Sequence, residues 1–77
     1  MDKAEQLRIM LPRRLKSAMF EKNINAKQLA DKVGVHKNHI SYYVRGIYFP
    51  QMSMLWEICD ALDVSADWLM GRKEEKR

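Results

Sequence analysis

The segment from Gln28 to Gly46 places two short amphipathic stretches on either side of one glycine. It reads QLADKVGVHKNHISYYVRG. Gly34 stands where a turn between helices needs positive φ, which costs glycine nothing, and Ala30 is small enough for a second helix to cross close by. The apolar residues at the remaining inward positions are Leu29, Val33, Val35, Ile40 and Tyr43. This spacing predicts a helix-turn-helix whose second helix runs from about residue 37 to 45.

The residues before this segment carry helix start signals. Pro12 suits the first turn of a helix, and the apolar spacing after it predicts a helix that ends at about Lys22. Asn25 and Gln28 stand three apart in the arrangement of a capping box. The next helix is therefore expected to begin at about Ala26, with His36 as the cap of the helix that follows the glycine.

Two more helices are predicted after Gly46. A core stripe at positions i, i+3, i+4 and i+7 is formed by Leu55, Ile58, Cys59 and Leu62. The Ser65 hydroxyl is placed to cap a short last helix that ends before Gly71. Because no segment alternates with the period of a strand, the predicted fold class is all-α, a compact bundle of five helices.

The length and charge of the chain limit its domain organisation and the kinds of partner that it can bind. Seventy-seven residues suffice for one domain, expected over residues 12–71, with residues 1–11 as an N-terminal extension in which the spacing of Leu7 and Leu11 allows a turn or two of helix. Residues 72–77, RKEEKR, are expected to be a solvated charged tail. The net charge of +4 attracts a polyanion without specifying which. The absence of a signal-peptide pattern and of a long apolar run predicts a cytoplasmic protein with no membrane contact.

Chemistry other than binding finds little support in the sequence. His36, His39 and Cys59 would be the candidates for a metal site, but a closed zinc site needs four ligands and Cys59 lies on an apolar stripe. The same cysteine has no histidine or acid obviously placed to activate it. No glycine-rich phosphate loop or paired carboxylates occur. The chain is therefore predicted to be no enzyme and to use no cofactor, metal or small-molecule substrate.

Three blocks of the sequence, QLADKVGV, ISYYVRG and LDVSADWLMG, resemble the lambda-repressor-like helix-turn-helix family. This family includes phage repressors and Cro-like transcriptional regulators, and the resemblance covers about residues 14–71. It implies a five-helix DNA-binding domain that acts as a homodimer on a palindromic operator in double-stranded DNA. Repression by blocking a promoter is the commonest mechanism in the family, although activation uses the same fold.

The resemblance also implies which residues would contact DNA. The base-facing positions of the recognition helix correspond here to Lys37, Asn38, Ser41 and Tyr42. Lysine can donate to guanine and asparagine can bond adenine in both directions, so the first two are expected to set specificity. Ser41 would approach a base or a thymine methyl, and Tyr42 would lie along the sugar-phosphate edge.

Phosphate contacts are expected from the start of the helix capped by Asn25 and flanked by Lys27, and from Arg45 at the end of the recognition helix. Many relatives carry basic residues in the following loop, whereas this chain has Ile47, Tyr48 and Phe49. In some phage repressors an arginine of the first helix pairs with a glutamate of the third. The matching positions here are Met19 and Val44, which would replace that ion pair by an apolar contact.

The apolar loop leaves two other interpretations open. Together with Met52, Met54 and Trp56 it supplies more apolar side chains than the core can take, so part of them would form a dimer interface, with core packing of Tyr48 or Phe49 as the alternative. One rival function is an antitoxin-like protein-interaction module with secondary DNA binding. Another is a DNA-targeting domain cut from a longer chain.

Overall fold

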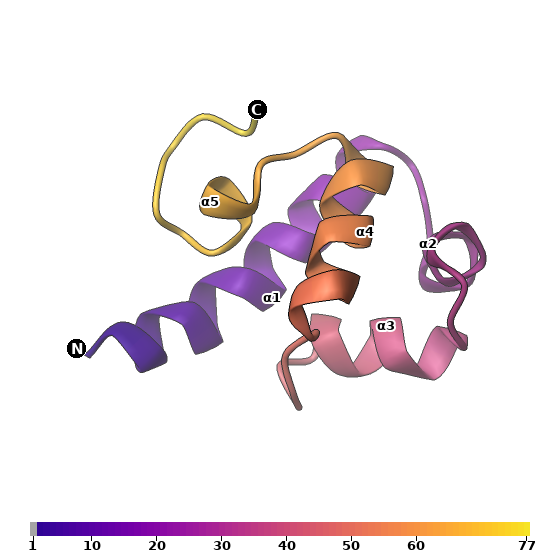
Figure 1. The fold of residues 1–77 in the computed structure, drawn as a ribbon, viewed down its shortest axis with the longest axis horizontal. Coiled ribbons are helices and arrows are strands. Elements are labelled where there is room, and N and C mark those ends of the chain that lie inside the picture. The colour runs from indigo at the N-terminus through magenta and orange to yellow at the C-terminus, as the bar shows by residue number, and fades with distance from the viewer. Residues whose placement is uncertain (1) are drawn as a thin grey trace.

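The structure, a computed structural model, describes residues 2–77 and consists of five helices. Their bounds are α1 (Lys3–Glu21), α2 (Ala26–Val33), α3 (Lys37–Val44), α4 (Met52–Leu62) and α5 (Ala66–Leu69). The long α1 runs diagonally through the molecule, with α3 on one side of it and α5 with the C-terminal tail on the other, while α2 lies beyond its C-terminal end (Figure 1). No strand occurs in residues 2–77. The predicted all-α, five-helix fold is confirmed.

The core draws on every helix. The largest fully buried side chains are Leu15, Leu29, Ile40, Ile58, Leu62 and Leu69. The four residues of the predicted α4 stripe are all buried, as are Trp68 and Leu69 of the short α5. The Ser65 hydroxyl accepts a hydrogen bond from the Trp68 amide at 3.0 Å, so the predicted cap of α5 is also confirmed.

The helix-turn-helix unit follows its local signals closely. The Asn25 side chain accepts from the Gln28 amide at 2.8 Å, and the Gln28 side chain accepts from the Asn25 amide at 2.9 Å, which completes the predicted capping box. Gly34 has φ of +77° and its amide donates to the Ala30 carbonyl at 2.8 Å. His36 caps α3 through Nδ1, which accepts from the Asn38 amide at 3.1 Å. The turn thus satisfies the backbone groups that two helix ends leave open.

The prediction that the first helix begins at Pro12 is wrong. The helix begins at Lys3, capped by the Asp2 carboxylate that accepts from the Glu5 amide at 2.8 Å, and Pro12 lies inside it. A proline inside a helix removes one hydrogen bond and costs about 3 kcal/mol, so tertiary packing must offset it. The ring lies close to Gly46, where an added Cβ would stand 3.3 Å from Pro12 Cγ. Leu11, placed in the extension by the sequence, is buried.

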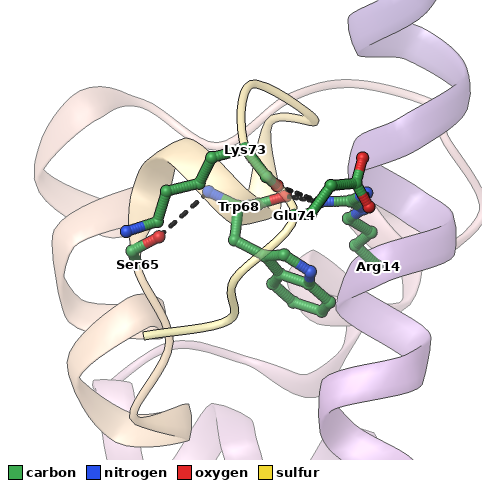
Figure 2. Close-up of polar contacts among 5 residues, drawn as sticks. All are labelled: Arg14, Ser65, Trp68, Lys73 and Glu74. Atoms are coloured by element: carbon green, nitrogen blue, oxygen red, sulfur yellow. Dashed lines mark hydrogen bonds and ion pairs between the residues drawn. The ribbon is translucent and has the colours of Figure 1, made fainter.

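The tail at residues 72–77 is expected to be solvated, and four of its six residues are exposed, but its backbone also contacts the domain. The tail folds back over α5 and α1, as Figure 2 shows for part of it. The Arg14 guanidinium donates to the backbone carbonyls of Trp68 at 2.8 Å and Lys73 at 2.7 Å. Further along, the Ser65 amide donates to the Lys76 carbonyl at 2.6 Å. These backbone contacts, made by residues distant in sequence, dock the tail on the domain.

Ion pairs reinforce this docking. Lys76 pairs with Glu21 at the end of α1, and Arg77 pairs with Glu21 at 3.6 Å and with Asp63 at 3.0 Å. The hydrogen bond and charge of Lys76 lower the pKa of the Glu21 carboxyl, and those of Arg77 lower the pKa of Asp63. Because these pairs are exposed to solvent, each adds little by itself.

Candidate nucleic-acid interface

Helix α3 turns one face toward the core and the other toward solvent. Ile40 and Tyr43 are buried, and burial raises the pKa of the Tyr43 hydroxyl. Lys37 and Asn38 are exposed in the first turn. Their side chains form no hydrogen bond or ion pair within residues 2–77. The polar groups of the first turn are therefore free to bind an external partner.

Further along α3, the aromatic and basic residues contact one another. Ser41 and Tyr42 are half-buried, and the Tyr42 ring lies 5.2 Å from the ring of Tyr48. The Arg45 guanidinium sits 5.4 Å from the centre of the Tyr42 ring, while Arg45 itself stays exposed. Tyr48 also meets the Tyr43 ring edge to face at 5.7 Å. These contacts restrict the orientation of Tyr42 and hold the Arg45 charge beside α3.

The start of α2 presents open backbone amides. The Asn25 side chain is occupied by its bond to the Gln28 amide. The amides of Ala26 and Lys27, in the first two positions of the helix, have no carbonyl partner within α2. The Lys27 ammonium pairs with Asp31 at 3.2 Å, but both side chains are exposed, so this pair contributes at most about 1 kcal/mol. A phosphate can compete with such a pair.

Charge is distributed unevenly along the chain. Residues 32–56, which contain all of α3, hold Lys32, Lys37 and Arg45 and not a single acid. Residues 57–67, which contain most of α4 and the start of α5, hold four acids and no lysine or arginine. The acids of that segment are Glu57, Asp60, Asp63 and Asp67. The net charge of the chain is thus the sum of a basic segment that contains α3 and an acidic segment on other elements, and this distribution favours approach of a polyanion to α3.

A groove between α1, α2 and α3 was not foreseen from the sequence. It has a volume of about 640 Å³ and a mainly apolar lining that includes Met19, Phe20 and Val44. The exposed side chains of Arg13 and Lys16 also line it. In the sequence, the only signal for this groove is the spacing of Arg13 and Lys16, which places both on one face of α1. That spacing alone does not show that the face lies toward α3. The predicted apolar contact between Met19 and Val44 stays a prediction, although both line this groove.

An apolar surface remains at the α3–α4 connection. We use the name α3–α4 patch for the exposed apolar side chains of this connection and of the start of α4, which are Ile47, Tyr48, Phe49, Met52 and Trp56. Met52 and Trp56 are 83% and 75% exposed, while Tyr48 and Phe49 are 43% and 37% exposed. Neither Tyr48 nor Phe49 belongs to the buried core. An apolar surface of this kind is typical of a protein contact.

Two of the three candidate metal and nucleophile residues, His36 and Cys59, have structural roles, whereas His39 is exposed on α3. His36 caps α3 through Nδ1, and Cys59 is buried in the core stripe, where burial raises the pKa of its thiol. A raised pKa makes the reactive thiolate scarcer. Within residues 2–77, no three His, Cys, Asp or Glu residues stand close enough to hold a metal ion. Over the same residues, no helix has the length and apolar character of a membrane span.

The capped pair α2–α3, the left-handed glycine between them and the exposed polar turn of α3 define a helix-turn-helix protein. The family model described as helix-turn-helix matches residues 15–69. The chain belongs to this family, in its lambda-repressor-like branch. The match extends from the second half of α1 to the last residue of α5, so it includes parts of all five helices and not the motif alone.

Similar proteins include two regulators from Bacillus. The chain is 31% identical over 64 residues to the HTH-type transcriptional regulator ImmR of Bacillus subtilis (strain 168), covering 83% of this chain and 50% of ImmR. It is 33% identical over 67 residues to the HTH-type transcriptional regulator SinR of Bacillus licheniformis, covering 86% of this chain and 60% of SinR. The chain thus spans about half the length of the curated relatives that it matches.

A solved structure supports the fold. The crystal structure of the hypothetical transcription factor NHTF from Neisseria superposes with a TM-score of 0.79 at 23% identity, over 90% of this chain and 76% of that one. Agreement over nine-tenths of the chain includes elements outside the helix-turn-helix. At this level of identity, the likeness concerns the fold alone.

Proposed function

We propose that this protein is a transcriptional regulator that binds double-stranded DNA in a sequence-specific manner, with α3 in the major groove. The observation that carries the proposal is the first turn of α3, where Lys37 and Asn38 are exposed and unpaired on a helix that the capped turn holds against α2. A recognition helix of this motif reads base edges with its N-terminal residues. The family membership and the names of both Bacillus relatives support the same function.

Three side chains of α3 are assigned to the bases and a fourth to the sugar-phosphate edge beside them. Asn38 would bond an adenine in both directions and Lys37 would donate to a guanine, each good pairing discriminating by about 1–3 kcal/mol. Ser41 is short and half-buried, so it suits close approach to a base edge. Tyr42 is held between Arg45 and Tyr48 and suits the sugar-phosphate edge beside the bases.

Three groups are assigned to the phosphates. Arg45 is exposed and forms no ion pair within the described residues. The open amides at the start of α2, fixed in direction by the Asn25 cap, suit a phosphate oxygen, and Lys27 adds a positive charge beside them. Such contacts position the domain and make affinity depend on salt, whereas the bases decide which sequence is bound.

The proposal includes a homodimer on a palindromic operator, acting as a repressor of phage or mobile-element type. The α3–α4 patch supports the dimer because it exposes apolar side chains directly after the recognition helix. Burying such surface stabilises a contact by about 25 cal/mol per Å². A contact next to α3 would fix the distance between two recognition helices, which a palindrome requires.

Selection of random duplex DNA by the purified chain at near-physiological salt, followed by sequencing of the bound fraction, tests the proposal. A palindromic consensus is expected, with half-sites separated by about one helical turn or a multiple of it. A consensus without symmetry would support sequence-specific binding and contradict the dimer. Retention of DNA only at low salt and without enrichment would contradict sequence-specific recognition and bring the protein-interaction alternative forward.

A further inference from the structure

The groove between α1, α2 and α3 joins residues from three helices at one edge of the recognition helix. Ser41, assigned above to the bases, lines the groove from α3, and Ala26, the first residue of α2, lines it from the other side. Arg13 and Lys16 contribute from α1. The groove is therefore continuous with the proposed DNA-binding surface and extends it onto α1.

The two basic residues of the groove are available for a ligand. Arg13 and Lys16 are exposed, and neither forms an ion pair or a side-chain hydrogen bond within residues 2–77. The neighbouring Arg14 differs because it is engaged by the carbonyls of Trp68 and Lys73. The groove thus combines unneutralised positive charge with an apolar floor.

Phe20 adds an exposed apolar side chain to the groove, so a ligand must match apolar surface as well as positive charge. It lies on α1 near the end of the helix and is 88% exposed although it lines the groove. Ile24 and Val44, both half-buried, continue the apolar lining. A ligand that suits this surface must present apolar groups to the floor and negative charge to Arg13 and Lys16. The edge of a DNA strand does so, because deoxyribose C–H groups alternate with phosphates along it.

We infer that this groove binds the sugar-phosphate edge of one DNA strand, with Arg13 and Lys16 on successive phosphates and Phe20 against a deoxyribose. The inference rests on the proposed function and adds α1 to the DNA-binding surface. The groove would contribute to DNA affinity in two ways. The basic residues release counterions and so govern salt dependence, whereas Phe20 contributes apolar contact that salt hardly affects.

Fluorescence anisotropy of a labelled duplex of mixed sequence, measured with the full chain over a range of salt concentrations, tests this inference. Arg13→Gln and Lys16→Gln are each expected to make the slope of log affinity against log salt shallower by about 1. Phe20→Ser is expected to lower affinity several-fold at every salt concentration and to leave the slope unchanged. The matched control is Arg72→Gln, which removes an exposed charge from the surface near Met10 and Gly71, and which is expected to leave the slope unchanged.

The outcomes separate this inference from the proposed function. If Arg13→Gln and Lys16→Gln behave like Arg72→Gln while the wild-type chain selects a consensus, the groove is excluded and the function stands. If the two variants flatten the slope but no consensus is selected, the groove binds DNA and sequence-specific recognition fails. If the wild-type chain binds no duplex even at low salt, both are refuted. Far-UV circular dichroism of each variant verifies that the helices are intact.

Discussion

Replacing Arg14 with methionine provides the sharpest test of how the tail is held. The Arg14 side chain is 12% exposed, and one guanidinium nitrogen, Nη1, donates to both the Trp68 and the Lys73 carbonyls (Figure 2). Its guanidinium also lies 5.0 Å from the centre of the Trp68 ring. Methionine keeps much of the length and the apolar packing but removes both hydrogen bonds and the charge.

The expected loss in the free energy of unfolding is about 2–4 kcal/mol. A hydrogen bond from a charged group contributes about 1.5–3 kcal/mol, and two of them are lost. Because Trp68 and Lys73 accept these bonds in a part-buried setting, water that enters the variant restores part of the loss. The ion pair from Arg14 to Glu74, at 3.4 Å, adds little because the Glu74 side chain is 90% exposed. Since a chain of this length is stable by only about 4–12 kcal/mol, the loss is large.

Urea denaturation followed by far-UV circular dichroism measures this loss. Two controls accompany Arg14→Met. Glu74→Gln removes only the exposed ion pair, and Arg13→Met makes the same change at the neighbouring exposed arginine, so both are expected to stay within about 0.5 kcal/mol of the wild type. The reasoning would be refuted by an Arg14→Met variant as stable as the wild type, or by a Glu74→Gln variant that loses as much as Arg14→Met.

Three further predictions concern the DNA-binding surface, the α3–α4 patch and the tail. Asn38→Ala should relax base preference at one operator position by about 1–3 kcal/mol, which repeating the DNA selection checks; an unchanged consensus would remove Asn38 from base recognition. Replacing both Tyr48 and Phe49 with serine should leave the circular dichroism spectrum unchanged and convert a dimer to a monomer, as measured by analytical ultracentrifugation. Loss of helical signal in this variant would instead assign both side chains to the core. Because Lys76 lowers the pKa of Glu21 in the folded chain, the pair stabilises the fold above the ordinary pKa of 4.5 and ceases to do so as pH falls through the lowered value. The melting temperatures of wild type and Glu21→Gln should therefore differ at neutral pH and converge in acid, and a constant difference would contradict the pairing.

The sequence alone predicted the parts of this protein that depend on near neighbours. A capping box joins residues three apart, and Gly34 ends a helix by its own backbone conformation. The buried stripe of α4 likewise follows from helical spacing within one segment. Each of these signals concerns residues within one or two turns of helix, so local stereochemistry decides it and a pattern in the sequence reveals it.

The residues of the proposed DNA-binding surface likewise divide into those that local signals in the sequence indicate and those that only the tertiary structure brings together. The exposure of Lys37 and Asn38 follows from the position of the capped start of α3, and the family resemblance of the sequence implies that those two residues read bases. That Arg13 and Lys16 share a groove with Ser41 depends on how α1 crosses α3. No pattern within α1 carries that information, since the crossing is set by the packing of several helices at once.

Arg13 and Arg14 illustrate what only the tertiary structure decided. The two are adjacent and chemically identical, yet one lines an open groove while the other binds a carbonyl 54 residues away. The same long-range packing docks the backbone of the tail, and it places Pro12 beside Gly46 inside a helix that the sequence predicted to begin at the proline. In each case the deciding partner is distant in sequence and near in space, because burial of the shared core brings it there.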